Sequence, residues 1–186
     1  MKVIFLDIDG VMNDELAYKA WQENPDKETL EDSDVPTDQH MAQLKRLVDV
    51  TGAEIVLSSA WRCSLWGIRT VLERFNDYGL KLLSVTDEGV SESVLEAAGF
   101  GDVNPKNTSK RVWDGSNALI IHDRGAEIAG WMLRHKNVSA FVILDDEDVD
   151  IKMYYPNNLI KTSFMTGLTD EDVAAAIKIL GGRSNE

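Results

Sequence analysis

The chain has 186 residues, 44% of them hydrophobic, which is typical of a single domain with a substantial core. Its formal net charge of −13 disfavours binding along extended nucleic acid, because an acidic surface repels a polyanion. The sequence has no apolar run of about 18 residues that could span a membrane and no pattern of a secretory leader. The single cysteine, Cys63, excludes an internal disulfide, so we expect a cytoplasmic protein with no membrane partner.

The first predicted element is a buried strand over residues 3–6, which runs directly into Asp7, Asp9 and Gly10. Side chains two positions apart in a strand point to the same face, so we expect the two acids to converge where the strand ends. Carboxylates held together there repel one another and lose hydration. A hard cation such as Mg²⁺ would remove this conflict, and Gly10 would let the backbone leave the strand sharply. Two solvated acids at a strand end are the structural alternative.

Residues 12–37 are polar and irregular, which predicts a flap beside this strand end, with a brief helix over 15–22. An ordinary surface loop is the alternative interpretation. The next helix is predicted to begin at Thr37 or Asp38, either of which can cap it, and to end near Val50.

Apolar periodicity predicts alternating strands and helices through the rest of the chain. This alternation indicates βαβ units and an α/β fold with a five-stranded, mostly parallel sheet covered on both faces. Residues 86–117 are predicted to form a small insert at the mouth of the site, with a loop over 99–115. The predicted elements are a strand over 54–57, a helix over 65–75, a strand over 80–85, a short helix over 91–98, an unassigned apolar run over 118–121, a helix from about 124, a strand over 141–144, a weaker strand over 159–162 and a last helix capped by Thr169.

Polar side chains follow three of the predicted strands. Right-handed crossovers place the carboxyl ends of parallel strands at one edge of the sheet, where open α/β sheets bind ligands. We therefore expect these polar side chains to gather around one site. For Ser58 the alternative is a cap of the next helix, and for the last acids it is a solvated turn. The residues are Asp7 and Asp9 after the first strand, Ser58 after the second, and Asp145 and Asp146 after the penultimate one.

The segment Asp7-Ile8-Asp9-Gly10-Val11 after an apolar strand resembles the first motif of the haloacid dehalogenase (HAD) superfamily of phosphotransferases and phosphatases. The order of acid pair, hydroxyl, basic residue and second acid pair along the chain is also similar to that superfamily. The resemblance implies a HAD-like Rossmannoid three-layer α/β/α sandwich with a small flap or minimal cap. It implies one domain over residues 1–186 and Mg²⁺ as the cofactor.

The resemblance implies a role for each residue at the strand ends. Asp7 would be the nucleophile that forms an aspartyl-phosphate. Asp9 would protonate the leaving oxygen and later activate water, and its backbone carbonyl would join the Mg²⁺ coordination. Ser58 would hydrogen-bond a phosphoryl oxygen. Asp146 is the favoured direct Mg²⁺ ligand, with Asp145 as a close alternative.

The basic residue of the superfamily has more than one candidate. The resemblance favours Arg124, which opens the helix that leads into the strand ending at Asp145, because the superfamily keeps its Lys or Arg at that place. Lys110 and Arg111, in the preceding segment, are the competing candidates. Most superfamily members carry Lys rather than Arg at this position. Further expected contacts to substrate are Gly10, Ser59, Arg62 and Lys110.

Three segments resemble a narrower group, the HAD domain of multidomain "Swiss Army knife" RNA repair proteins. That resemblance implies a phosphate on a nucleotide or at a nucleic acid end as the substrate. Trp61 or Trp66 could stack a base and Arg62 could hold a second phosphate, although core Trp and surface Arg residues are more common. The segments are Ser58-Ser59-Ala60-Trp61-Arg62, Arg124-Gly125-Ala126-Glu127-Ile128 with Trp131, and Ile143-Leu144-Asp145-Asp146.

The favoured function is thus a Mg²⁺-dependent phosphomonoester hydrolase that acts through an aspartyl-phosphate. A phosphotransferase that passes the phosphoryl group to a second substrate is one alternative. A non-catalytic module that binds a phosphorylated ligand is the other, although every candidate catalytic position carries a chemically competent residue.

Overall fold

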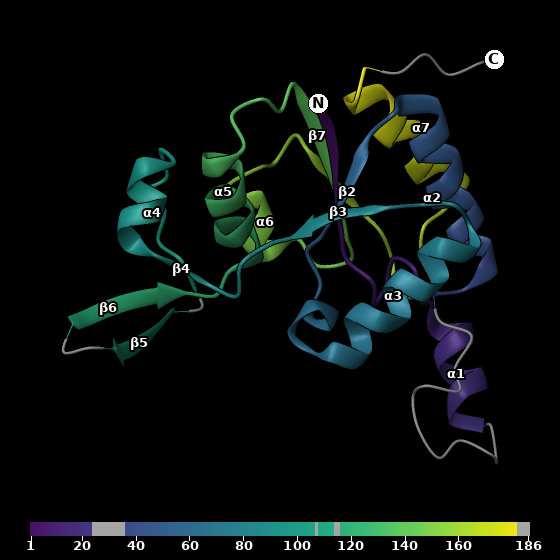
Figure 1. Ribbon diagram of the computed structural model, residues 1–186, viewed down its shortest axis with the longest axis horizontal. Coiled ribbons are helices and arrows are strands. Elements are labelled where there is room, and N and C mark those ends of the chain that lie inside the picture. The colour runs from purple at the N-terminus through teal and green to yellow at the C-terminus, as the bar shows by residue number, and fades with distance from the viewer. Residues whose placement is uncertain (24–35, 107, 114–115, 182–186) are drawn as a thin grey trace.

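The computed structural model describes residues 1–23, 36–106, 108–113 and 116–181, and the side chains of Trp21 and of residues 108–118 lie outside this description. A five-stranded sheet forms the centre of the fold (Figure 1), with strands in the order β3-β2-β1-β7-β8. Every neighbouring pair is parallel, which confirms the predicted sheet. The strands are β1 (Lys2–Leu6), β2 (Glu54–Leu57), β3 (Leu82–Val85), β7 (Ala140–Asp145) and β8 (Leu159–Lys161).

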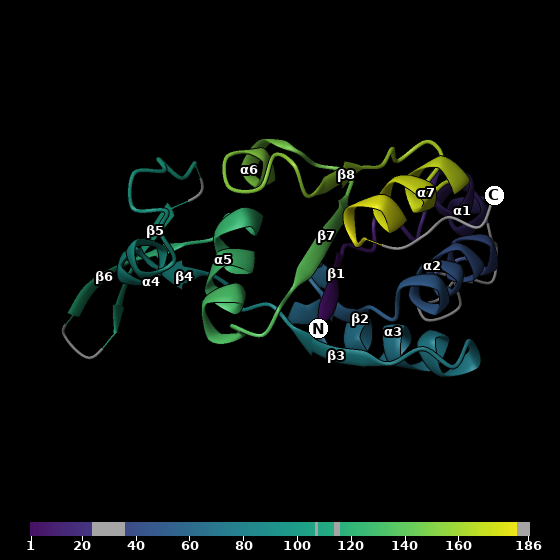
Figure 2. The ribbon, with the colours of Figure 1, turned by 90° about the horizontal axis from the view of Figure 1, so that it is seen from above.

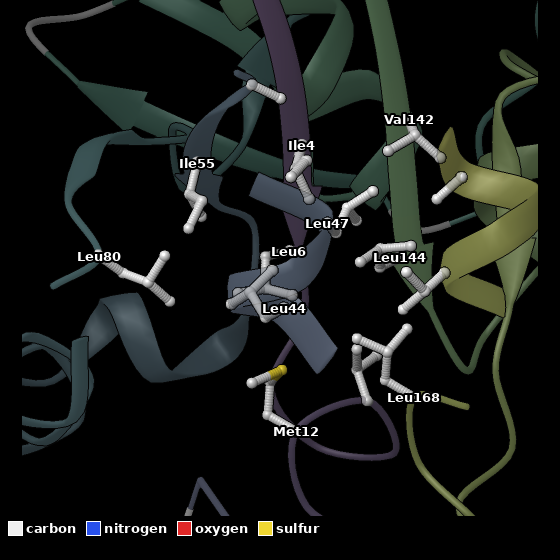
Figure 3. Close-up of a cluster of buried hydrophobic side chains, with 14 of the residues drawn as sticks. Ile4, Leu6, Met12, Leu44, Leu47, Ile55, Leu80, Val142, Leu144 and Leu168 are labelled. Carbon is white, nitrogen blue, oxygen red and sulfur yellow. The ribbon is translucent and has the colours of Figure 1, made fainter. Parts of the chain in front are cut away.

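Helices cover both faces of this sheet, as Figure 2 shows, so the fold has the predicted three layers. Along β1, Ile4 and Leu6 face one layer, whereas Val3 and Phe5 face the other, because side chains alternate in a strand. The first layer holds the larger core, part of which is drawn in Figure 3. Helices α2 (Asp38–Thr51), α3 (Leu65–Asp77) and α7 (Asp170–Ile179) form the first layer, and α5 (Arg124–Arg134) and α6 (Val149–Lys152) form the second.

Local capping determines where the predicted helices begin and end. Thr37 is the N-cap of α2, where its hydroxyl accepts a hydrogen bond from the backbone N–H of His40. Gly52 ends α2 in the left-handed conformation, with φ of 64°. Thr169 and Asp172 form a capping box at the start of α7. These observations confirm the helix ends expected from the sequence.

A second sheet lies in the predicted insert, and it corrects the expectation of a loop over 99–115. Strands β4 (Val90–Ser91), β6 (Ser116–Ile121) and β5 (Thr108–Trp113) form an antiparallel sheet in the order β4-β6-β5. The short helix α4 (Glu92–Ala97) follows β4, as predicted. The prediction was wrong for 108–113 because polar residues dominate this strand, which pairs with β6 in the described part of the chain.

The predicted flap begins with α1 (Glu15–Glu23), which confirms the brief helix, whereas residues 24–35 lie outside the description. In Figure 1, α1 and the β4-β6-β5 sheet lie on opposite sides of the molecule, toward the end at which β1 finishes. No helix in the described ranges combines the length and the apolar character needed to cross a membrane.

Candidate active site

The alternation of side chains along the strands decides which polar groups meet. Asp7 follows Val3 and Phe5 at intervals of two residues, so it continues the β1 face that packs against α5. Asp145 continues the same face of β7 after Ile143. Since β1 and β7 are neighbours in register, with Leu6 opposite Leu144, Asp7 and Asp145 lie side by side at the carboxyl edge.

Three carboxylates form a compact cluster at this edge. One oxygen each of Asp7, Asp145 and Asp146 lies within 4.8 Å of the other two, which is a spacing that could hold one metal ion. Asp7 is 8% exposed and Asp145 is 2% exposed, so two of the three acids are buried. A cavity of about 380 Å³ opens over the cluster. It is lined by Asp7, Asp9, His122, Arg124, Asp145, Asp146, Glu147, Asp150 and Ile151.

Burial and mutual repulsion make the cluster costly when no cation is present. Burial, opposed in part by the charge of Arg124, raises the pKa of Asp7. Burial and the neighbouring Asp7 raise the pKa of Asp145 to about 7. The same two causes raise the pKa of Asp146. Such a shift reports free energy that a bound cation would recover, because the ion favours the charged form of each acid.

Arg124 is the cation that reaches the cluster from the helix layer. Its Nη1 lies 3.5 Å from Asp7 Oδ1 and its Nε lies 3.8 Å from Asp145 Oδ2. Despite this proximity, Nη1 is buried and has no hydrogen-bond partner in the described part of the chain. A guanidinium that is held by charge but keeps a free donor suits an incoming anion, such as a phosphoryl oxygen.

Asp9 does not join the carboxylate cluster. After β1 the chain turns sharply, with Gly10 N–H donating to the Asn13 carbonyl at 2.9 Å. The turn directs the exposed Asp9 carboxylate toward Trp61 and Asn13, both of which donate hydrogen bonds to it. The expected convergence of Asp7 and Asp9 is therefore only partial, because the chain leaves the strand after Asp7 and the alternation no longer applies at Asp9.

A family comparison agrees with this geometry. A model of the family described as "HAD domain in Swiss Army Knife RNA repair proteins" matches residues 3–173 of the chain. The chain belongs to this family. HAD domains form a phosphatase-type hydrolase superfamily whose members generally use Mg²⁺. No curated protein and no solved structure matches the chain.

The serines after β2 occupy two different positions in this HAD domain. Ser58 is buried beside the exit of β3, where its Oγ accepts a hydrogen bond from the Thr86 hydroxyl at 3.4 Å. The Ser59 hydroxyl lies beside Asp7 and opposes the rise in the pKa of that acid. Its hydroxyl also accepts a hydrogen bond from the backbone N–H of Trp61 and caps the 3-10 turn η2 (Ala60–Cys63). Ser59 is thus the serine in contact with the acid cluster.

Arg62, expected to bind substrate, is instead surrounded by protein oxygens. Its guanidinium forms a buried ion pair with Glu127 at 2.6 Å, and both side chains are 6% exposed. It also donates to the carbonyls of Ser59, Thr86 and Asp87. These contacts differ both from the expected contact with a second phosphate and from the alternative of a surface Arg, because the guanidinium is buried against protein oxygens. Arg62 therefore links the segments that follow β2 and β3 to α5. It does so through Glu127, which lies one helical turn after Arg124.

Glu127, the acid that holds Arg62, was missed by the sequence analysis of this HAD domain. It is 4% exposed and also accepts the Gly89 N–H at 3.0 Å. Burial raises its pKa to about 6, although Arg62 and Arg124 oppose the rise. Its spacing of three residues from Arg124 places it on the same side of α5, which is the only signal that the sequence offers. Lys110 falls in β5, and its side chain lies outside the described residues.

Gly10 holds a position that other residues cannot take without displacing the cluster. Its φ is 71°, and a Cβ built on it would overlap the Asp146 carboxyl group. Its carbonyl accepts a hydrogen bond from the Thr162 hydroxyl at 2.7 Å, which fixes the turn against the end of β8. The turn and the Asp146 carboxyl therefore depend on the absence of a side chain at position 10.

If Mg²⁺ binds the acid cluster and raises the Tm, Gly10→Ala should lose this stabilisation, because the new methyl group would push Asp146 out of the cluster. The left-handed backbone should also cost about 1–2 kcal/mol in the free energy of unfolding. Gly79→Ala is the matched control, since Gly79 has φ of 64° but no atoms within 4 Å of an added Cβ. Melting curves with and without Mg²⁺ measure both effects. An unchanged Mg²⁺ response in Gly10→Ala would contradict the assignment of Asp146.

Proposed function

We propose that this chain is a Mg²⁺-dependent phosphomonoester hydrolase that acts through an aspartyl-phosphate on Asp7. The supporting observation is that a group of acids and a donor of Arg124, unpaired among the described residues, lie next to each other. Three clustered carboxylates favour a cation, and the buried Arg124 Nη1 beside them favours an anion. A phosphate monoester together with a divalent cation satisfies both groups at once.

The donor set of the cluster suits Mg²⁺ in particular. All three groups are carboxylates, which are hard oxygen ligands, and the described residues that line the cavity include no thiol. Asp145 Oδ1 accepts the Glu147 N–H at 2.9 Å and its Oδ2 faces Arg124, so Asp146 has the freer carboxylate for ligation. Asp7 and Asp146 would hold the ion, and Asp145 would add a third negative charge close to it. When bound, Mg²⁺ would neutralise charge on the phosphoryl oxygens and on the acids.

The chain's own residues would divide the reaction between them. An Asp7 carboxylate oxygen would form a bond to phosphorus as the bond from phosphorus to the leaving oxygen breaks. Arg124 Nη1 would donate to a phosphoryl oxygen and hold it in place for in-line attack. Asp9 would give its proton to the leaving oxygen, and would then take a proton from the water that attacks the acyl phosphate. In this second step the water oxygen bonds to phosphorus as the bond from phosphorus to the Asp7 oxygen breaks, which releases inorganic phosphate and restores both carboxyl groups.

We further propose a nucleotide or a nucleic acid end as the source of the phosphate. The family description names RNA repair proteins, which supports a phosphorylated end as the substrate of this chain too. The net charge of −13 disfavours long contacts to a polyanion but leaves recognition of one terminal phosphate possible. Arg124 supplies the local positive charge for that phosphate.

The test is release of inorganic phosphate, with Mg²⁺ and with EDTA, from three kinds of monoester. Mononucleotides, oligonucleotides phosphorylated at the 3′ or the 5′ end, and small sugar phosphates are compared at equal concentration. We expect Mg²⁺-dependent release, fastest with one of the nucleotide-type substrates. Absence of release from every substrate would overturn the proposal. Transfer of the phosphoryl group to added glycerol in preference to water would replace the hydrolase with a phosphotransferase.

We expect the apparent affinity for Mg²⁺ to rise with pH up to about pH 7. Without the ion, the folded cluster keeps protons that the same acids have lost in the unfolded chain, since the pKa of Asp145 is raised to about 7. Mg²⁺ must displace these protons, so its affinity should rise by up to about tenfold per pH unit below that pKa. Conversely, the stability of the ion-free protein should fall as the pH rises from about 4 to 7.

Thermal melts with a Mg²⁺ titration at pH 5.5 and pH 8 measure this linkage. The Mg²⁺-induced rise in Tm should be clearly larger at pH 8. Asp148→Asn is the control, because Asp148 pairs with Lys152 and Lys161 outside the cluster and should leave the effect intact. Equal Mg²⁺ responses at the two pH values would contradict the predicted proton release.

A further inference from the structure

The Asp9 carboxylate is held from two sides although it lies at an exposed position of the cavity. Trp61 Nε1–H donates to Asp9 Oδ2 at 2.9 Å, and Asn13 Nδ2–H donates to Asp9 Oδ1 at 3.1 Å. An exposed carboxylate ordinarily rotates among several orientations in water. With one donor on each oxygen, the plane of this group is fixed relative to the cavity.

Trp61 is itself held in place by the surrounding structure. Its ring centroid lies 4.8 Å from that of Trp66, at an angle of 41°, and the ring packs against the larger core. Its carbonyl accepts the Ser64 N–H at 3.3 Å, and a Cβ on Gly67 would overlap that carbonyl. The ring is therefore anchored by α3, and its N–H edge is the part that reaches the Asp9 carboxylate.

Asn13 is equally constrained on the other side. It is 6% exposed, and its backbone N–H donates to the Ile8 carbonyl at 3.1 Å. Its backbone carbonyl accepts the Gly10 N–H, which closes the turn that follows β1. The side-chain amide thus reaches Asp9 from within the turn, whereas the indole reaches it from η2. Two segments far apart in the sequence meet at one carboxyl group.

We propose that Trp61 is a positioning residue of the reaction, and that Asn13 assists it. The indole N–H orients the Asp9 carboxyl group so that its proton is delivered to the leaving oxygen. This inference rests on the proposed function, in which Asp9 is the general acid. It assigns to Trp61 a task in proton transfer, through its N–H edge, in place of stacking on a base. A general acid is effective only when its proton lies along the path to the leaving group.

The test compares two substrates that differ in their need for an acid. Departure of 4-nitrophenolate from 4-nitrophenyl phosphate needs little protonation, whereas departure of an alkoxide from glycerol 2-phosphate needs much. Trp61→Phe keeps an aromatic ring and removes the N–H donor. We expect it to lower kcat for glycerol 2-phosphate by about tenfold, and kcat for 4-nitrophenyl phosphate by less than about twofold. KM should change little for either substrate.

Asn13→Ala, which removes the second donor, should show the same selective loss. Trp66→Phe changes the neighbouring ring but no donor to Asp9, so any loss should be equal for the two substrates. Asp9→Asn sets the upper limit of the selective effect. Melting curves establish that each variant is folded at the assay temperature.

The outcomes separate this inference from the proposed function. A selective loss in Trp61→Phe and none in Trp66→Phe supports the positioning role. Equal losses on both substrates, or none, in a folded Trp61→Phe protein overturn it. If Asp9→Asn shows no dependence on the leaving group, Trp61 cannot act through a general acid and the inference also fails. None of these outcomes bears on the proposed nucleophile, which is tested separately with Asp7→Asn.

Discussion

Asp7→Asn is expected to lower phosphomonoester turnover by at least about 10³-fold, because the substitution removes the nucleophile and keeps the size of the side chain. Asp7 is placed for this role at the end of the central strand, in the acid cluster and 3.5 Å from Arg124. Steady-state release of phosphate from the best substrate measures the loss. A second measurement is capture of the phosphorylated protein by acid quenching and mass spectrometry, which should succeed with Asp7 and fail with Asn.

The same substitution should raise the stability of the ion-free protein at pH 8. Burial raises the pKa of Asp7, so its ionised form is disfavoured in the folded state. A neutral amide removes that cost and also removes repulsion with Asp145 and Asp146. A variant that is inactive but more stable cannot owe its inactivity to misfolding.

Asp148→Asn serves as the control for this prediction. It removes an acid from the loop after β7 but leaves the cluster unchanged, so turnover should persist. Full turnover in Asp7→Asn, or a phosphorylated species that survives the substitution, would contradict the role of Asp7 as nucleophile.

The sequence was sufficient to predict the edge of the sheet at which Asp7, Asp145 and Asp146 gather, because that prediction needs only strand positions and alternation. Buried strands at 3–6 and 141–144 end in acids, and parallel strands share an edge. Asp7 and Asp145 come two residues after Phe5 and Ile143, so they lie on the same face of the sheet as those residues. Arg124 follows from the start of α5, which packs against that face.

Other features depend on contacts between segments that local patterns do not encode. The burial of Arg62 requires Glu127, which lies 65 positions away in the chain. The contact between Trp61 and Asp9 spans 52 positions and depends on the turn at Gly10. Strand β5 was missed, although Asp114-Gly115 before the apolar run is a sequence signal for a hairpin. In each case the partner, rather than the residue itself, determines the structure.

Arg124→Met is expected to lower kcat/KM by about 10²- to 10³-fold, since it removes the positive charge and the free donor that face the acid cluster. Arg124→Lys keeps the charge but loses the planar fork of donors, so it should recover only part of the activity. The pH dependence should change as well. The charge of Arg124 lowers the pKa of Asp7 and of Asp145, and its loss should move the rising limb of the pH–rate profile to higher pH.

Arg134→Met is the matched control because it removes an Arg from the other end of α5. Arg134 pairs with Asp87 at 2.7 Å on the surface, where ion pairs contribute little to stability. Its substitution should leave kcat/KM and the pH profile unchanged. If Arg124→Met loses activity without any shift of the rising limb, Arg124 binds the phosphoryl group without tuning the acids. If it keeps its activity, Arg124 is not the basic residue of the site.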